Sequence, residues 1–231
     1  MMSTLYEPLG YGVGGLSLGG GASFHTGKRG FTCDDIVNYE IVLADGTIAN
    51  ANAVENPGLH RASKGGGNNF GIVTRFDLQT FEDAKGGLYG GLLFSTCDDR
   101  DAILAQSSRL VEINHEPPKD TEVIAFTYGG SEVFDARLDY LARSVSMQIL
   151  EQESVAFAKL AALTAELGAY AESKDAATTW RYLNYVSPAQ DPFSTFGEEK
   201  FQLLEKVAAE YDPKGFFQPR VSGGFKIPRV Q

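Results

Sequence analysis

Apolar side chains crowd residues 36–43, and the run ends just before Asp45-Gly46, a dipeptide typical of tight hairpin turns. This pattern predicts a pair of antiparallel strands between Asp35 and Ile48. Residues 70–81 alternate apolar and polar side chains from Val73 onward, which predicts a further strand with one buried face. The first third of the chain is therefore expected to contain a small antiparallel sheet.

Other stretches have helical spacing. Asn56-Pro57 predicts a short helix that runs to about Lys64, with Asn56 as its N-cap. Longer helices are expected at 98–115, 134–149, 154–170 and 198–211. In the third of these, an apolar stripe of Val155, Leu160, Leu163 and Leu167 is expected to pack into a core. Residues 123–128 predict a strand, and the aromatic alternation of 179–185 predicts a short one.

Glycine is concentrated at 10–21 and again at 65–71. Glycine lets the backbone approach a ligand or another backbone closely, so two such clusters suggest a cradle for a large, flat ligand. Gly10-x-Gly12-x-x-Gly15 matches a dinucleotide-binding fingerprint, which requires a strand before the glycines and a helix directly after them. We expect neither, because Pro8 interrupts the preceding segment and each glycine of Gly19–Gly21 would weaken a helix by about 1 kcal/mol.

Composition narrows the function. The 231 residues are 43% hydrophobic, enough for a sizeable core in one or two domains. The formal charge of −10, without a basic stripe, argues against nucleic acid or an anionic membrane surface as the main partner. The sequence has neither an apolar run long enough to span a bilayer nor the layout of a signal peptide.

Several kinds of catalytic site lack support. Cys33 and Cys97 fit no metal spacing and are interpreted as buried or free thiols. The three histidines, His25, His60 and His115, lie far apart, so no metal site is expected. Neither a Gly-x-Ser-x-Gly nucleophile elbow nor a phosphate-binding Gly-Lys-Ser/Thr loop occurs.

Two blocks of sequence carry a family resemblance. The first comprises Val13–Gly21, Gly30–Asp35, Asn38–Ile48 and Lys64–Leu78, and the second comprises Tyr182–Tyr185 and Tyr211–Phe217. Together they cover roughly half of the chain and resemble FAD-linked oxidases of the berberine-bridge-enzyme-like group, in the vanillyl-alcohol oxidase superfamily with its PCMH-type FAD-binding domain.

The resemblance implies an α+β fold in three parts. Residues 1–82 would be the second half of the FAD-binding domain, 83–178 a shortened substrate-binding domain, and 179–231 a C-terminal segment that returns to the flavin. The resemblance also implies a first half of the FAD domain upstream, to which nothing here corresponds, and an internal deletion in the substrate domain. A second covalent flavin link, through a cysteine, is not expected, because Pro8 stands at that position.

The resemblance further implies functional residues. Tyr182 matches a catalytic tyrosine and Asn184 an asparagine that holds the isoalloxazine, although Tyr182 can equally be a half-buried strand aromatic. The expected contacts to the FAD are Gly12, Val13, Gly14, Gly15, Gly19, Gly20, Gly21, Gly30, Gly71, Ile72, Val73 and Asn184. Where the family usually has apolar helix residues this chain has His60, Arg61 and Ser63, which is expected to loosen the helix packing.

Two functional hypotheses follow. In the first, the chain is an FAD-dependent oxidoreductase in which a base takes a proton from a small organic substrate, hydride passes to the flavin, and molecular oxygen reoxidises it. Alcohols, carbohydrates, phenolics and alkaloid-like compounds all fit the family. In the second, the chain is an inactive fragment of such an oxidase, without flavin, in which the glycines serve only backbone packing.

Overall fold

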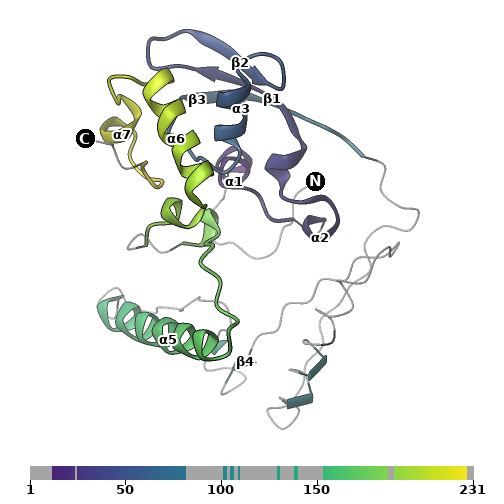
Figure 1. Cartoon of the computed structure of the whole chain (residues 1–231), viewed down its shortest axis with the longest axis vertical. Coiled ribbons are helices and arrows are strands. Elements are labelled where there is room, and N and C mark those ends of the chain that lie inside the picture. The colour runs from purple at the N-terminus through teal and green to yellow at the C-terminus, as the bar shows by residue number, and fades with distance from the viewer. Residues whose placement is uncertain are drawn as a thin grey trace. The chain divides into compact units, whose positions relative to one another are not determined.

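The computed structural model describes residues 12–23, 25–81, 153–186 and 190–227, together with nine single positions between 101 and 139. Two compact units are present: the first combines residues 1–85 with 179–231, and the second comprises 86–178. The first unit is thus built from two segments that are distant in the sequence (Figure 1).

The first glycine cluster contains a short helix. Helix α1 spans Val13–Leu18, begins after an extended Gly12 and ends at Gly19. A helix therefore does follow the first glycines, and the expectation that none would form there was wrong. Gly19–Gly21 end this helix rather than prevent it. Helix α2 (Thr26–Arg29) and the 3-10 helix η1 (Thr32–Asp35) come next.

A three-stranded antiparallel sheet follows, in the order β2-β1-β3. Strand β1 (Ile36–Val42) pairs with β2 (Ile48–Asn52) through a turn in which Gly46 has a φ of 86°. The predicted hairpin and the predicted third strand, β3 (Ile72–Leu78), are both confirmed. The burial of β3 does not alternate strictly, since most of its residues are exposed and its pairing with β1 contains register shifts.

Helix α3 (Pro57–Ser63) packs on both β2 and helix α6 (Glu198–Tyr211), and both helices match the predicted ranges. Asn56 precedes α3 as expected, but its side chain does not cap the helix. It donates a hydrogen bond to the Asn50 carbonyl at 2.7 Å and accepts one from the Tyr211 hydroxyl at 3.0 Å. Asn56 therefore joins the sheet to α6.

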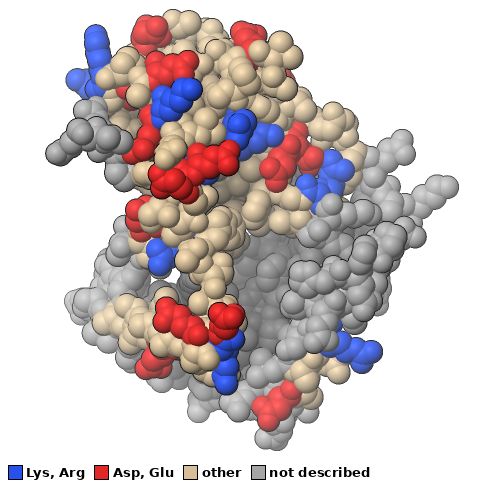
Figure 2. Space-filling model, viewed as in Figure 1, with Lys and Arg blue, Asp and Glu red and all other residues tan. Residues whose placement is uncertain are grey.

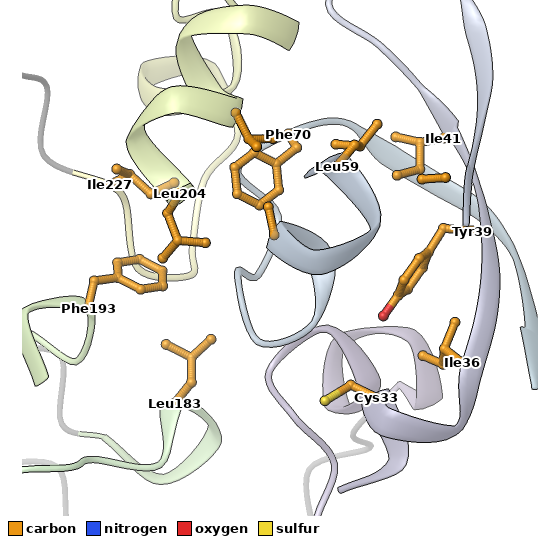
Figure 3. Close-up of a cluster of buried hydrophobic side chains, with 13 residues drawn as sticks. Cys33, Ile36, Tyr39, Ile41, Leu59, Phe70, Leu183, Phe193, Leu204 and Ile227 are labelled. Carbon is orange, nitrogen blue, oxygen red and sulfur yellow. The ribbon is translucent and has the colours of Figure 1, made fainter. Parts of the chain in front are cut away.

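One hydrophobic core holds the first unit together. Figure 3 shows Phe193, Leu204 and Ile227 from the C-terminal segment lying opposite Leu59 and Phe70. All of these side chains are buried. The core members are Cys33, Ile36, Tyr39, Ile41, Ala51, Leu59, Ala62, Phe70, Leu183, Phe193, Leu204, Val207 and Ile227. Burial of apolar surface from both segments is what stabilises their association.

The C-terminal segment is mostly irregular apart from α6. Residues 179–182 form no strand, and the 3-10 helix η4 (Leu183–Tyr185) follows them, so the short aromatic strand predicted there was wrong. The 3-10 helix η5 (Phe193–Thr195) precedes α6, and α7 (Phe217–Arg220) follows it. The buried carboxylate of Asp212 accepts hydrogen bonds from the Phe216 and Phe217 amides at the start of α7.

In the second unit, helix α5 spans Glu153–Ser173 and confirms the prediction for 154–170. Leu167 of its apolar stripe is 45% exposed and does not lie in a core. Strands β4 (Gly129–Gly130) and β5 (Leu138–Asp139) pair with each other, so the helix predicted over 134–149 is wrong at Leu138–Asp139. Residues 101, 102, 105, 106 and 109 are helical, whereas the strand predicted at 123–128 lies outside the described residues.

The mixture of helices with an antiparallel sheet confirms an α+β fold. Figure 2 shows acidic and basic side chains interspersed over the visible face, without a broad basic area. In the described part of the chain, no helix combines the length and the apolar character that crossing a bilayer requires. Among the same residues, no three His, Cys, Asp or Glu side chains cluster in a way that could hold a metal ion.

Candidate functional site

The hydroxyl of Tyr182 lies at the end of the glycine-rich segment. It accepts hydrogen bonds from the backbone N–H of Gly21 at 3.1 Å and of Ala22 at 2.7 Å. The Asn184 side-chain amide donates a third hydrogen bond to it at 2.9 Å. Three donors converging on one oxygen stabilise negative charge there, as the donors of an oxyanion hole do.

Asn184 also contacts the glycine-rich segment. Its amide also donates to the carbonyl of Leu16, in the last turn of α1, at 2.9 Å. A Cβ at Gly19 would lie 1.9 Å from Asn184 Oδ1, so only glycine leaves room for the asparagine. The two C-terminal residues predicted to be functional, Tyr182 and Asn184, thus meet the predicted glycines directly.

Aromatic rings surround Tyr182. Phe31 stacks on it with ring centroids 5.3 Å apart and an interplanar angle of 10°. Trp180 lies 6.0 Å from Tyr182 and 5.8 Å from Phe31. Tyr185 meets Tyr182 edge to face at 5.0 Å. The position of Tyr182 is therefore set by ring packing as well as by its hydrogen bonds.

Five of the predicted FAD contacts line one pocket of about 300 Å³, here called the apolar pocket. Gly14 and Gly15 of α1 form one side, and Gly71, Ile72 and Val73 at the start of β3 form another. The remaining lining residues are Leu18, Asn68, Phe76, Phe217 and Val221. Two segments that sequence reasoning had linked only by their glycines therefore line the same pocket.

A second pocket, here called the aromatic-basic pocket, has a volume of about 380 Å³. Gly19, Gly20 and Tyr182 are its predicted site residues. Sequence reasoning missed its other lining residues, which are Phe31, Cys33, Asp34, Arg61, Lys64, Gly65, Trp180, Leu183, Phe196 and Lys200. It shares no lining residue with the apolar pocket.

Lys200 is an unusual member of this second pocket because it lies on the buried face of α6. Its ammonium donates to the carbonyls of Arg61 at 2.5 Å and Lys64 at 3.2 Å, at the end of α3. Burial, together with the nearby positive charges of Arg61 and Lys64, lowers the pKa of Lys200 to about 8. The sequence signal was its helical register, since Lys200 precedes the buried Leu204 by four residues and Val207 by seven.

Two further titratable groups, Cys33 and Tyr39, are buried in the core. Burial raises the pKa of the Cys33 thiol to about 11 and raises the pKa of the Tyr39 hydroxyl as well. Cys33 forms no disulfide, in line with a buried thiol, whereas Cys97 lies outside the described residues. Neither shifted group favours the ionised form that a nucleophile or base requires at neutral pH.

The predicted glycines fall into two groups. A Cβ would collide with protein atoms at Gly19, Gly21, Gly30 and Gly71, in the last case lying 2.4 Å from Ile41 Cγ2. At Gly20 it would lie 3.0 Å from the Tyr182 ring. By contrast, no atom lies within 4 Å of a Cβ built at Gly12 or Gly15, and Gly14 has only Phe76 at 3.5 Å.

Five predicted contacts line neither pocket: Gly12, Val13, Gly21, Gly30 and Asn184.

The polar residues of α3 are accommodated in the fold. His60 Nε2 is 2.9 Å from the Ile36 carbonyl oxygen, and Ser63 is buried. With Leu59 and Ala62 fully buried, the helix keeps an apolar face on the core.

Comparison with known proteins found no family model that matches. A curated relative, the FAD-dependent monooxygenase tpcD of Cochliobolus heterostrophus, is 46% identical over 118 residues, which is 51% of this chain and 22% of tpcD. An uncharacterized FAD-linked oxidoreductase of Arthroderma benhamiae is 52% identical over 37% of this chain and 17% of its own length. The chain spans only about a fifth of these two relatives.

A third relative aligns with nearly the whole chain. The FAD-dependent monooxygenase sdcF of Emericella nidulans is 25% identical over 339 aligned positions, covering 95% of this chain and 71% of sdcF. Because 339 positions exceed the 231 residues of the chain, part of sdcF has no counterpart here, in agreement with an internal shortening.

Two solved structures align over shorter stretches. The VAO-type flavoprotein MtVAO615 of Myceliophthora thermophila is 34% identical over 29% of this chain and 12% of its own, with a TM-score of 0.28. The BBE-like 1 protein of Physcomitrella patens is 42% identical over 28% of this chain and 14% of its own, with a TM-score of 0.27.

Proposed function

Since the chain is a relative of FAD-linked oxidases of the berberine-bridge-enzyme-like group, we propose that it carries part of an FAD-dependent oxidoreductase that oxidises a small organic molecule by two electrons. Tyr182 is the proposed base and Asn184 its positioning partner. Molecular oxygen is the proposed final electron acceptor. The observation that carries the proposal is the convergence of three N–H donors on the Tyr182 oxygen, at the end of the glycine-rich segment.

Tyr182 has the surroundings that a proton-accepting oxygen needs. A group that takes a proton from a substrate hydroxyl must be held in place and must tolerate negative charge. The amides of Gly21 and Ala22 belong to the backbone, so they stay directed at the oxygen without losing side-chain entropy. Asn184 adds a third donor and is itself held by Leu16. The proton would rest on the Tyr182 oxygen, in the place of one of the three N–H donors.

The apolar pocket fits part of an FAD. Its volume of about 300 Å³ suits one ring system of the cofactor, and its walls at Gly14 and Gly15 bring bare backbone to the surface. Ile72 and Val73 add apolar contacts. FAD bound here would supply the capacity to accept a hydride from the substrate. We therefore keep Gly14, Gly15, Gly71, Ile72 and Val73 as the proposed cofactor contacts.

The domain roles are also proposals. Residues 1–82 and 179–231 would hold the cofactor, and 83–178 would contribute to substrate binding. The compactness of the unit formed by 1–85 and 179–231, and its separation from 86–178, supports this division of labour.

Visible absorption of the desalted chain, before and after incubation with FAD, tests cofactor binding. We expect flavin bands that persist through desalting. A Cβ at Gly15 would have no atom within 4 Å, and Gly15→Leu would place a side chain in the apolar pocket and should reduce FAD uptake. Gly168→Leu is a matched control, because Gly168 is also a helical glycine with open space around it and belongs to the second unit. Equal FAD uptake by both variants would contradict the assignment of the pocket.

A specific observation also favours the second hypothesis, an inactive fragment without flavin. Gly19, Gly21 and Gly71 are required by contacts with this chain's own atoms, so they would persist even if no cofactor bound. The two hypotheses differ in Tyr182→Phe. If the chain is an oxidase, this variant loses turnover and keeps FAD, whereas an inactive fragment takes up no FAD with either side chain.

A further inference from the structure

The aromatic-basic pocket, defined above, combines two chemical features that neither the family relationship nor the proposed base requires. Flat aromatic rings line part of it, here called the aromatic wall, and cationic side chains line another part, here called the rim. Its volume of about 380 Å³ is within the range of small-molecule sites.

The aromatic wall is formed by Phe31, Trp180 and Tyr182. Tyr182 is stacked with both other rings, at interplanar angles of 10° to Phe31 and 29° to Trp180, and Phe31 and Trp180 are tilted by 32° to each other. Trp180 is 45% exposed, so part of its ring remains accessible to a ligand. Accessible rings offer offset-stacked contacts to another planar aromatic group.

The charge of the rim is opposite to that of the whole chain. Arg61, Lys64 and Lys200 line the pocket with one carboxylate, Asp34, whereas the chain has 20 basic and 30 acidic residues. Asp34 is already engaged, because its carboxylate accepts the Phe31 backbone N–H at 2.9 Å. The local excess of positive charge therefore favours an anion.

The basic side chains retain N–H donors for a ligand. Lys64 Nζ donates to the Asp34 carbonyl at 3.1 Å, which occupies one of its three N–H groups. Arg61 pairs with Glu199 at 3.6 Å, and both side chains are mostly exposed, so this ion pair is weak and easily exchanged. Both residues therefore keep N–H donors for an incoming carboxylate.

We propose that the aromatic-basic pocket binds a one- or two-ring aromatic carboxylate, with the ring against Phe31 and Trp180 and the carboxylate at Arg61 and Lys64. The further step, that such acids are the substrate class that Tyr182 meets, rests on the proposed function. Binding itself does not, because no pocket residue involved lines the proposed cofactor site.

Trp180 provides the assay, since it is the chain's one tryptophan. The full chain is titrated with 4-nitrobenzoate and with the neutral, nearly isosteric 4-nitrobenzamide, and quenching of tryptophan fluorescence is corrected with free N-acetyltryptophanamide. We expect saturable quenching by the carboxylate and binding of the amide that is about tenfold weaker. Raising the salt concentration until the Debye length falls from about 10 Å to about 3 Å should weaken the binding of the carboxylate and leave the binding of the amide unchanged.

Variants of the basic residues test where the carboxylate binds. Arg61→Gln/Lys64→Gln should reduce the affinity for 4-nitrobenzoate to about that for the amide. Lys174→Gln is the control, because it removes a positive charge from the second unit, just after the end of α5. Circular dichroism checks that all variants fold. Equal affinity for the carboxylate and the amide, unsaturable quenching, or an equal loss in the Lys174 control would each overturn the proposal.

The outcome is separable from that of the proposed function. Saturable carboxylate binding by a chain that takes up no FAD would establish the pocket and refute the oxidase. If the chain retains FAD and 4-nitrobenzoate does not quench its tryptophan fluorescence in a saturable way, the proposed ligand pocket is refuted and the proposed oxidase is not.

Discussion

Removal of one oxygen atom tests how Tyr182 is held. Tyr182→Phe keeps the ring that stacks on Phe31, but it deprives the amides of Gly21, Ala22 and Asn184 of their common acceptor. A hydrogen bond contributes about 0.5–1.5 kcal/mol net, and a buried donor without a partner costs about 1–3 kcal/mol. Because these bonds are only partly buried, water can replace some of them. We therefore expect a loss of about 2 kcal/mol in the free energy of unfolding.

Tyr39→Phe is the matched comparison within the same unit. The Tyr39 side chain is fully buried, and no hydrogen-bond partner for its hydroxyl is found among the described residues. Removing a buried, unpaired hydroxyl should leave the free energy of unfolding unchanged or raise it by about 1 kcal/mol. The same chemical change is thus expected to act in opposite directions at the two tyrosines.

Urea unfolding followed by far-ultraviolet circular dichroism measures both variants against the wild type. The dependence of the unfolding free energy on urea should be unchanged, since neither variant alters the surface exposed on unfolding. A double-mutant cycle of Tyr182→Phe with Asn184→Ala should give a coupling above about 0.5 kcal/mol, because the two side chains share a hydrogen bond. If Tyr182→Phe and Tyr39→Phe shift stability equally, the hydrogen bonds to the Tyr182 oxygen do not hold the site.

Three further changes have expected outcomes that thermal or urea unfolding can check. Gly71→Ala should lower the free energy of unfolding by more than about 2 kcal/mol, because its Cβ would overlap Ile41. The control Gly58→Ala, in α3, meets nothing closer than 3.8 Å and should raise the free energy of unfolding by about 0.5–1 kcal/mol. Equal effects of the two variants would contradict the packing at Gly71. Asp212→Asn should cost about 1–3 kcal/mol, because a buried carboxylate that accepts two backbone amides is replaced by a group with one acceptor oxygen, and an unchanged midpoint would refute this role. The pKa of Lys200 is lowered from 10.5 to about 8, so the unfolded chain binds the extra proton between these values and the wild type should gain stability relative to Lys200→Met as the pH rises above about 8. A constant difference between these two proteins from pH 7 to about 9.5 would show that Lys200 is not desolvated.

The sequence predicted the elements whose signals are local. Asp45-Gly46 and the apolar run before it were enough for the β1–β2 hairpin, and the spacing of apolar residues in 198–211 was enough for α6. The helix α1 was missed because its glycines argue against helix formation locally. Its carbonyl at Leu16 is held by Asn184, 168 residues away, and such a tertiary contact overrides propensity.

The candidate site was predictable only in part. The glycines, Tyr182 and Asn184 could be named from motifs, but motifs did not reveal that some glycines face open space and others face protein atoms. The basic rim of the second pocket combines residues from α3 and α6, which are more than a hundred positions apart, so no local pattern could indicate it. Lys200 alone carried a signal, as a charged residue in the buried register of its helix.

In the first unit, residues from two distant segments form the site around Tyr182. This explains how the site can be kept while the sequence between the segments changes in length. Tyr182 and Asn184 are joined to the glycine segment by hydrogen bonds, and Leu183 between them is anchored in the core shared with Cys33 and Leu59. None of these contacts involves residues 86–178, which form a separate unit. The geometry around Tyr182 is therefore set by the two segments that meet there, and not by the length of the sequence between them.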